Sequence, residues 1–166
     1  MTEPGASTVN PTDAQVGYQA AVSLWASEGN MVWAKFNALL VANSIVLAIY
    51  GLALGSAKVS RAFIIGLPIA GIVLCMVWWT QTKRGFDYFA YWISSARELE
   101  ESCLSSRVKT ITRGGSFAEG RPVSVTVNGR SREFRMSRSS RLLKANLGAY
   151  AVIGVFAALY VVMLFN

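Results

Sequence analysis

Three long apolar runs dominate the chain, and none contains a charged side chain: residues 36–55, 62–79 and 147–165. A helix rises about 1.5 Å per residue, so about 20 residues cross the ~30 Å hydrocarbon core of a bilayer. The pattern predicts an all-α membrane protein with three transmembrane helices, over residues 36–56, 62–81 and 145–165. The short stretch Ser56–Ser60 forces the first two into an antiparallel helical hairpin.

Before the first run, apolar residues recur at helical spacing. Residues 1–12 are polar and rich in turn-forming types, and we expect a disordered tail there. Residues 13–35 then predict an amphipathic N-terminal helix that leads into the first span and lies against the bilayer or against neighbouring helices. Its apolar stripe consists of Tyr18, Val22, Trp25, Val32 and Phe36.

After the second run, aromatic and charged residues replace purely apolar ones. The pattern predicts that the helix continues over residues 82–108, with the charges of Arg97, Glu98, Glu100 and Glu101 on its exposed face. Aromatic rings gather at the headgroup level of membranes. The predicted interface aromatics are Trp78, Trp79, Phe86, Tyr88, Tyr91 and Trp92.

Residues 109–143 predict a basic loop that contains a small β-hairpin over residues 122–136. Valine alternates with serine and threonine from Val123 to Val127, and Asn128-Gly129 follows. Alternation into Asn-Gly is the strongest short hairpin signal in a sequence. The glycine-rich stretch Arg113–Pro122 before it is expected to be a flexible connector, because it lacks a phosphate-binding pattern.

The charge distribution predicts the orientation in the membrane. Of the 16 Lys and Arg residues, 13 lie between Lys83 and Lys144, and basic loops stay in the cytoplasm. The N-terminus and the segment between spans two and three are therefore expected to be cytoplasmic, and the C-terminus outside.

A basic row borders the third span. Such a row predicts binding of anionic lipid, at roughly 1 kcal/mol per residue near the surface, although the same charges would also anchor the topology without a specific lipid. Nucleic-acid binding is not favoured, because no reading surface accompanies the charge. The row consists of Arg132, Arg135, Arg138, Arg141 and Lys144.

Each span carries small residues four positions apart, which let helix backbones approach closely in lipid. The pairs are Gly51 with Gly55, Gly66 with Ala70, and Gly154 with Ala158. They serve packing either among the chain's own helices or between subunits. Span one also contains Asn37, Asn43 and Ser44, which we expect to contact another helix or to line a pore.

Several classes of function are excluded or disfavoured. The chain has no histidine, and its two cysteines, Cys75 and Cys103, lie far apart, so we expect no enzyme activity, cofactor or metal site. No span holds an ionisable group of the kind that proton-coupled transporters and voltage sensors use. Three spans are too few to enclose a path, so any pore needs several copies.

Residues 25–105 resemble small bacterial membrane proteins of the RipA and SLATT kind. That resemblance implies a transmembrane hairpin with helical cytoplasmic extensions, an oligomer, and a candidate pore-forming role in bacterial defence or stress. The residues that carry it are Lys35-Phe36-Asn37 and Asn43-Ser44, Lys83-Arg84-Gly85-Phe86-Asp87-Tyr88, Tyr91-Trp92, and Ala96-Arg97-Glu98-Leu99-Glu100.

Two hypotheses follow from these observations. The first is a homo-oligomer of the bacterial plasma (inner) membrane that forms a pore or perturbs the membrane in stress or defence. The second is a non-conducting scaffold that binds anionic lipid or a partner protein at the cytoplasmic face.

Overall fold

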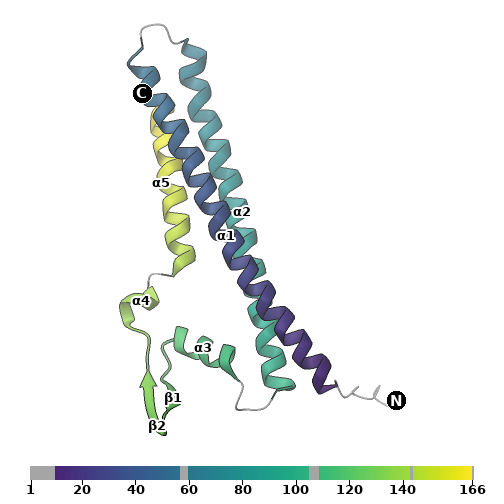
Figure 1. The fold of residues 1–166 in the computed structure, drawn as a ribbon. Helices are drawn as coiled ribbons and strands as arrows, with labels where there is room; N and C mark the ends of the chain where they lie inside the picture. Colours follow the sequence, from purple (N-terminus) through teal and green to yellow (C-terminus); the bar gives the residue numbers. More distant parts are fainter. Residues whose placement is uncertain (1–9, 57–59, 105–108, 143, 166) are drawn as a thin grey trace, which may run out of the picture. The chain divides into compact units, whose positions relative to one another are not determined.

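The computed structural model describes residues 10–56, 60–104, 109–142 and 144–165, which are mostly helical (Figure 1). Five helices and one antiparallel hairpin form this part of the chain. In order they are α1 (Pro11–Leu54), α2 (Arg61–Ser102), α3 (Thr110–Ala118), β1 (Val123–Val127), β2 (Arg130–Phe134), α4 (Arg138–Leu142) and α5 (Ala145–Phe165).

Three helices, α1, α2 and α5, are long and apolar enough to cross a membrane. Helix α1 has 44 residues, so it is about 66 Å long and exceeds the ~30 Å hydrocarbon core. Helix α2 is nearly as long, with 42 residues. Both run without a break through the boundaries expected near residues 35 and 81, so the spanning segments and their polar extensions share single helices.

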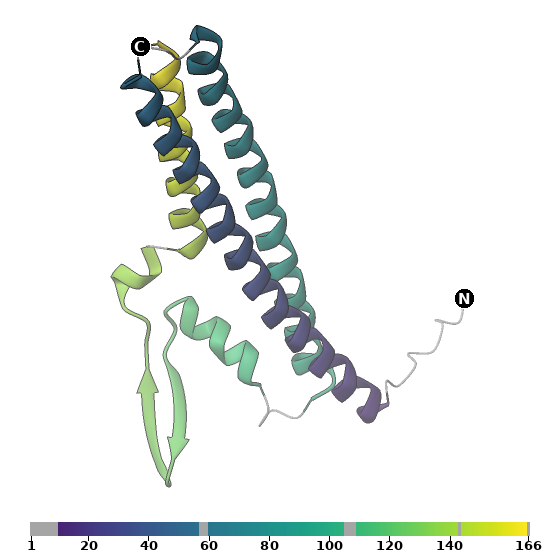
Figure 2. The same ribbon diagram turned by 45° about the horizontal axis from the view of Figure 1, so that its top comes forward.

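The chain divides into two compact units. The bundle unit comprises Glu28–Asp87 and Leu143–Asn166, and the hairpin unit comprises Met1–Ser27 and Tyr88–Leu142. In the bundle unit, aromatic rings join all three spanning helices: Trp78 of α2 lies 4.8 Å from Phe36 of α1 and 5.8 Å from Phe156 of α5, between ring centroids. Both views show the three helices side by side (Figures 1 and 2).

Two glycines make close contacts in this bundle possible. Gly71 of α2 lies against the ring of Tyr160, and Gly85 lies against the side chain of Val32. A methyl group at either glycine would overlap its neighbour. Large side chains therefore pack into notches on α2, and the core consists of Phe36, Cys75, Trp78, Ala149, Ile153 and Tyr160.

In the hairpin unit, the first turns of α1 pack against the last turns of α2, with Trp25 and Phe89 in ring contact at 5.3 Å. The predicted hairpin is confirmed, with Val123 opposite Phe134 and Val127 opposite Arg130. Its two-residue turn places Asn128 at φ 52° and Gly129 at φ 75°. Both angles lie in the left-handed region that a type I′ turn requires, which explains the Asn-Gly pair.

Two expectations are wrong. The stretch expected to be a flexible connector is helical as far as Ala118, in α3. Glu100, expected on an exposed face, is fully buried. The two errors have one cause, because the Glu100 carboxylate accepts hydrogen bonds from the first turn of α3. Most of the expected tail, residues 1–9, and the expected helix end at 105–108 lie outside the described residues.

Candidate assembly surface

Asn43 ties the spanning helices together inside one protomer. Its side chain is fully buried, and its Nδ2 donates to the carbonyl of Leu39 at 2.8 Å. The thiol of Cys75 donates to its Oδ1 at 3.6 Å, and the hydroxyl of Tyr160 donates to its backbone oxygen at 3.0 Å. Asn43 is therefore an interhelical contact of the protomer and is not available to line a pore.

Asn37 and Ser44 lie on a different face of α1 and are exposed. The Ser44 hydroxyl donates to the carbonyl of Leu40 at 2.8 Å, whereas the Asn37 amide has no hydrogen-bond partner among the described residues. Asn30 and Gly51 are exposed as well. The four residues Asn30, Asn37, Ser44 and Gly51 therefore recur every seven residues along the helix. Residues at this spacing share one face of a helix. The result is a polar and small stripe on α1, and we call these four residues the α1 stripe.

The paired small residues also point away from the bundle. All six are exposed, and a Cβ built on Gly51, Gly66 or Gly154 would meet nothing within 4 Å. Gly71 and Gly85, which pack inside the bundle unit, belong to none of the predicted pairs. The exposure of these pairs favours packing between subunits over packing among the chain's own helices. They are free for contact with another molecule.

An apolar groove lies between α2 and α5 of the bundle unit. Its volume is about 540 Å³. It passes beside Gly154, so one member of an exposed small pair forms part of its wall. Its lining residues are Ile72, Cys75, Met76, Trp79, Thr80, Ile153, Gly154 and Ala157.

The predicted interface aromatics separate into different environments. Trp78 is fully buried in the core, so the expectation of an interfacial ring is wrong for this residue. Phe86 and Trp92 are half-buried, and Trp79, Tyr88 and Tyr91 are exposed. Trp79 packs against Tyr150 at 4.5 Å and Tyr91 against Trp92 at 4.9 Å, between ring centroids.

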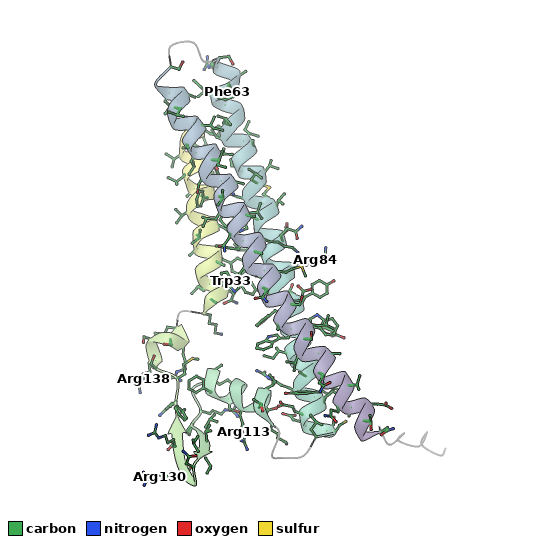
Figure 3. The ribbon with its side chains drawn as sticks, in the orientation of Figure 1. Trp33, Phe63, Arg84, Arg113, Arg130 and Arg138 are labelled. Atoms are coloured by element: carbon green, nitrogen blue, oxygen red, sulfur yellow. The ribbon has the colours of Figure 1, made fainter. Side chains whose placement is uncertain are left out.

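The five predicted lipid-binding cations also separate. Arg132, Arg135, Arg138 and Lys144 are exposed, and Arg141 is half-buried. Arg135 donates from Nε to the carbonyl of Gly120 at 3.0 Å, and the Arg141 guanidinium lies against the Cα of the same glycine. Two of the five therefore hold the turn between α3 and β1. Figure 3 shows Arg113, Arg130 and Arg138 on three separate elements of the hairpin unit, α3, β2 and α4. These cations therefore do not form one cluster.

Glu100 forms a buried polar centre in the hairpin unit. Its Oε1 accepts from the Tyr18 hydroxyl at 2.7 Å and from the backbone N–H of Ile111 at 2.8 Å, and its Oε2 accepts from the N–H of Thr112 at 2.8 Å. The first N–H groups of a helix have no acceptor within the helix. In α3, the Glu100 carboxylate is the acceptor for two of them. No local sequence pattern indicates this cap, because it comes from a helix that ends before α3 begins.

The pKa values of this centre follow from its contacts. Burial alone would raise the pKa of Glu100, but the hydrogen bonds from Ile111, Thr112 and Tyr18 outweigh burial and hold it below the ordinary value. Burial, together with the hydrogen bond to Glu100 and its negative charge, raises the pKa of Tyr18 to about 12. The ionised Glu100 and the neutral Tyr18 are therefore the forms that hold this unit together.

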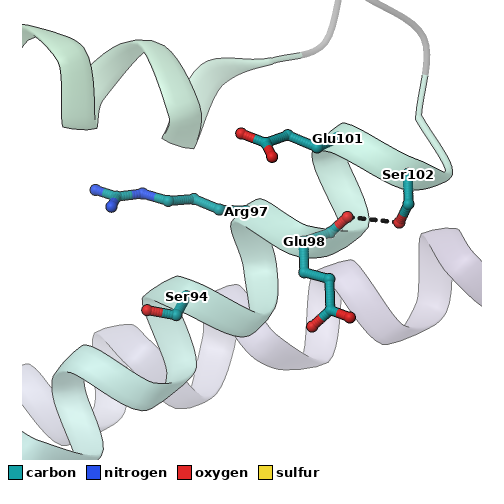
Figure 4. A pocket seen from close by; sticks show the side chains of 5 residues that line it. All are labelled: Ser94, Arg97, Glu98, Glu101 and Ser102. Carbon is teal, nitrogen blue, oxygen red and sulfur yellow. Dashed lines mark hydrogen bonds between the residues drawn. The ribbon is translucent and has the colours of Figure 1, made fainter.

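A polar pocket lies on the last turns of α2, near Glu100. It is a shallow depression open to solvent, with a volume of about 530 Å³, and it is lined by Ser94, Arg97, Glu98, Glu101 and Ser102. Figure 4 shows the Arg97 and Glu101 side chains extending from α2 to the same side, and the Ser102 hydroxyl bonded to the backbone of Glu98. Among the described residues, no group of three or more His, Cys, Asp or Glu side chains could hold a metal ion.

Comparisons with known proteins agree with an assembling membrane protein. No curated protein and no solved structure gives a significant match. The model of one family, described as the octameric membrane protein family (8xMP), matches residues 17–165, almost the whole chain. The chain therefore belongs to the octameric membrane protein family, which confirms the expectation of a self-assembling membrane protein.

Proposed function

We propose that eight copies form a ring in a membrane and that helix α1 of each copy lines a water-filled pore. The observation that carries this proposal is the α1 stripe. Asn37 and Ser44 lie within an apolar run long enough to span a bilayer, yet they face away from the protomer's own helices. An unpaired polar group facing lipid is costly. The Asn37 amide, which has no hydrogen-bond partner among the described residues, therefore needs water or another subunit, whereas the Ser44 hydroxyl already donates to the carbonyl of Leu40.

The symmetry of the proposed ring follows from membrane insertion. The uneven distribution of basic residues inserts every copy in the same orientation. A shared orientation excludes two-fold axes in the membrane plane, which leaves cyclic symmetry. Neighbours in a ring meet through two different faces. The small pairs on α2 and α5, Gly66 with Ala70 and Gly154 with Ala158, supply two such faces.

The width of the proposed pore follows from helix packing. Eight helices spaced about 9 Å apart in a ring have their axes about 12 Å from the centre, and a helix radius of about 5 Å leaves a lumen of about 7 Å radius. Water fills a lumen of this width, and hydrated ions pass through it. Rings of Asn37 and Ser44 from eight copies would line its wall.

The proposed location is the bacterial plasma membrane, with the N-terminus and the hairpin unit's loop in the cytoplasm and the C-terminus outside. The basic residues between Lys83 and Lys144 support this orientation. A pore, or a membrane-perturbing effector in stress or defence, is also the role that the resemblance to RipA and SLATT proteins implies.

Cysteine accessibility tests the pore directly. In a Cys103→Ser background, Asn37→Cys and Ser44→Cys should react with a charged, water-soluble thiol reagent in intact octamers. Val73→Cys on α2 and Val155→Cys on α5 are matched controls, because both positions are exposed on the bundle within apolar runs but lie outside the α1 stripe. We expect them to stay unmodified. Unreactive Asn37→Cys and Ser44→Cys in an intact octamer would contradict the pore.

A second candidate, a non-conducting scaffold for anionic lipid, is favoured by the exposed cations Arg132, Arg138 and Lys144. Replacing these three by glutamine should weaken recovery of anionic lipid with the purified protein relative to zwitterionic lipid. Replacing Arg121, which pairs with Glu119 at 2.9 Å, is the control. Equal lipid recovery from both variants would contradict this role.

A further inference from the structure

The hairpin has two free edges. In a two-residue hairpin, the pair next to the turn is hydrogen-bonded and bonded pairs alternate from there. In this register, the N–H and C=O groups of Val123, Val125 and Val127 bond to β2 inside the hairpin. The N–H and C=O groups of Ser124 and Thr126 on β1 therefore point outward. On β2, those of Ser131 and Glu133 point outward. The sheet of the described residues has two strands, so neither edge is paired.

The edge of β1 lacks the features that keep exposed strands apart. Its five residues, Val123–Val127, contain no charge and no proline. Proteins usually protect such an edge with charges, proline, a bulge or a covering element, because it pairs readily with another strand. Here Ser124 and Thr126 are exposed and make no hydrogen bond among the described residues.

One face of the hairpin carries four apolar side chains, Val123, Val125, Val127 and Phe134, next to the two cations Arg130 and Arg132. Val125, Val127 and Phe134 are 39%, 55% and 47% exposed. Beside them, an apolar groove of about 470 Å³ lies between this face and α3. A two-stranded hairpin alone is only marginally stable in water. A third strand beside it would add backbone hydrogen bonds and cover apolar surface.

We infer that the occupant is the hairpin of the neighbouring subunit: the β1 edge of one copy pairs with the β2 edge of the next, so that the octamer carries a continuous antiparallel β-collar. A ring needs two different, complementary faces on each subunit. The hairpin supplies them, since the free N–H and C=O groups of Ser124 and Thr126 on β1 can pair with those of Ser131 and Glu133 on β2. The inference rests on the family's octameric assembly and is independent of the pore.

Mixed disulfide cross-linking tests the collar in the full-length octamer. Thr126→Cys and Glu133→Cys are made separately in a Cys103→Ser background, co-assembled and oxidised. Native mass spectrometry establishes that the octamer is present. A disulfide needs Cα atoms about 4.4–6.8 Å apart, the reach of paired strands, and pairing Thr126→Cys with Ser131→Cys in a parallel sample covers the alternative register.

We expect disulfide-linked dimers in at least one mixed sample and none with Thr126→Cys alone. Dimers with Thr126→Cys alone would show that two β1 edges pair with each other and would overturn the collar. Intact octamers without cross-links in either mixed sample would overturn it as well. That result would show that the hairpins of neighbouring subunits are not paired with each other.

A proline substitution provides an independent measurement. The N–H of Thr126 points out of the hairpin, so Thr126→Pro removes a bond to a neighbour without removing one inside the hairpin. We expect it to raise the protein concentration needed for half-assembly by about tenfold, and Thr126→Val, which keeps the N–H, to leave assembly unchanged. Equal assembly of the proline and valine variants would contradict the inference.

Discussion

Replacing Glu100 by glutamine should release α3 from the rest of the hairpin unit. Glutamine keeps the shape of the side chain, but one of its two oxygens becomes an NH2 group that cannot accept a hydrogen bond. The carboxylate uses both oxygens, one for Tyr18 and Ile111 and the other for Thr112. At least one of the three bonds must be lost in the variant.

The expected cost follows from the charge of the acceptor. A hydrogen bond to an ionised group contributes about 1.5–3 kcal/mol. Every 1.4 kcal/mol is a factor of ten in an equilibrium constant, so the opening of α3 should become about 10 to 150 times more frequent. Hydrogen–deuterium exchange measures how often α3 opens, and we expect faster exchange at the amides of Ile111 and Thr112.

Glu101→Gln is the matched control, because Glu101 is the adjacent residue and is exposed. It should leave exchange in α3 unchanged. The reasoning would be refuted if both variants exchanged at the wild-type rate at Ile111 and Thr112. The pH dependence has a definite sign: the pKa of Glu100 is lowered in the fold, so its contribution is present above the ordinary carboxyl value of about 4.3 and is lost as the pH falls.

Other consequences of the structure are measurable in the same way. Because the folded pKa of Tyr18 is raised to about 12, its contribution is complete below the ordinary value of about 10 and lost as the pH rises toward 12, so exchange in α3 should accelerate over that window in wild type but less in Tyr18→Phe. Gly154→Leu should lower the octamer fraction in native mass spectrometry at unchanged helicity, whereas Gly71→Ala, which overlaps Tyr160, should destabilise the protomer by about 1–3 kcal/mol in unfolding titrations; the opposite pattern would place the subunit contact elsewhere. Tyr160→Phe removes the bond to the backbone of Asn43 and should cost about 0.6 kcal/mol in the same titration, the mean for such bonds in membranes.

The elements that sequence reasoning predicted are those encoded by local patterns. An apolar run of about 20 residues has few alternatives to a spanning helix, and Asn128-Gly129 meets the backbone requirement of a tight turn by itself. Helix α3 was missed because its N-cap residue is Lys109, whose side chain makes no capping hydrogen bond, and because its middle contains Gly114 and Gly115, which favour a loop. Its stability comes from Glu100, a contact that only the folded chain creates.

The sequence also does not predict which face of each helix is buried in the protomer. Phe36, Asn43 and Tyr50 recur every seven residues on α1 and are buried, while Asn37, Ser44 and Gly51 recur at the same spacing and are exposed. Each residue of the second series follows a member of the first directly in the sequence. The spacing shows that residues share a face, but only the packing of α2 and α5 decides which series lies inside.

The distribution of small and large residues then becomes an argument about assembly. Lipid gives apolar helices no hydrophobic reason to associate, so contacts between them depend on close backbone approach and on polar groups. The protomer satisfies its own contacts with large rings in the notches at Gly71 and Gly85. The small pairs lie on the faces that remain, together with the Asn37 amide, which has no hydrogen-bond partner in the described part of the chain. A lone protomer in lipid would gain nothing from them. Membership of an octameric family supplies the neighbour that these faces require, and in the ring that we propose, copies of the α1 stripe would face one axis.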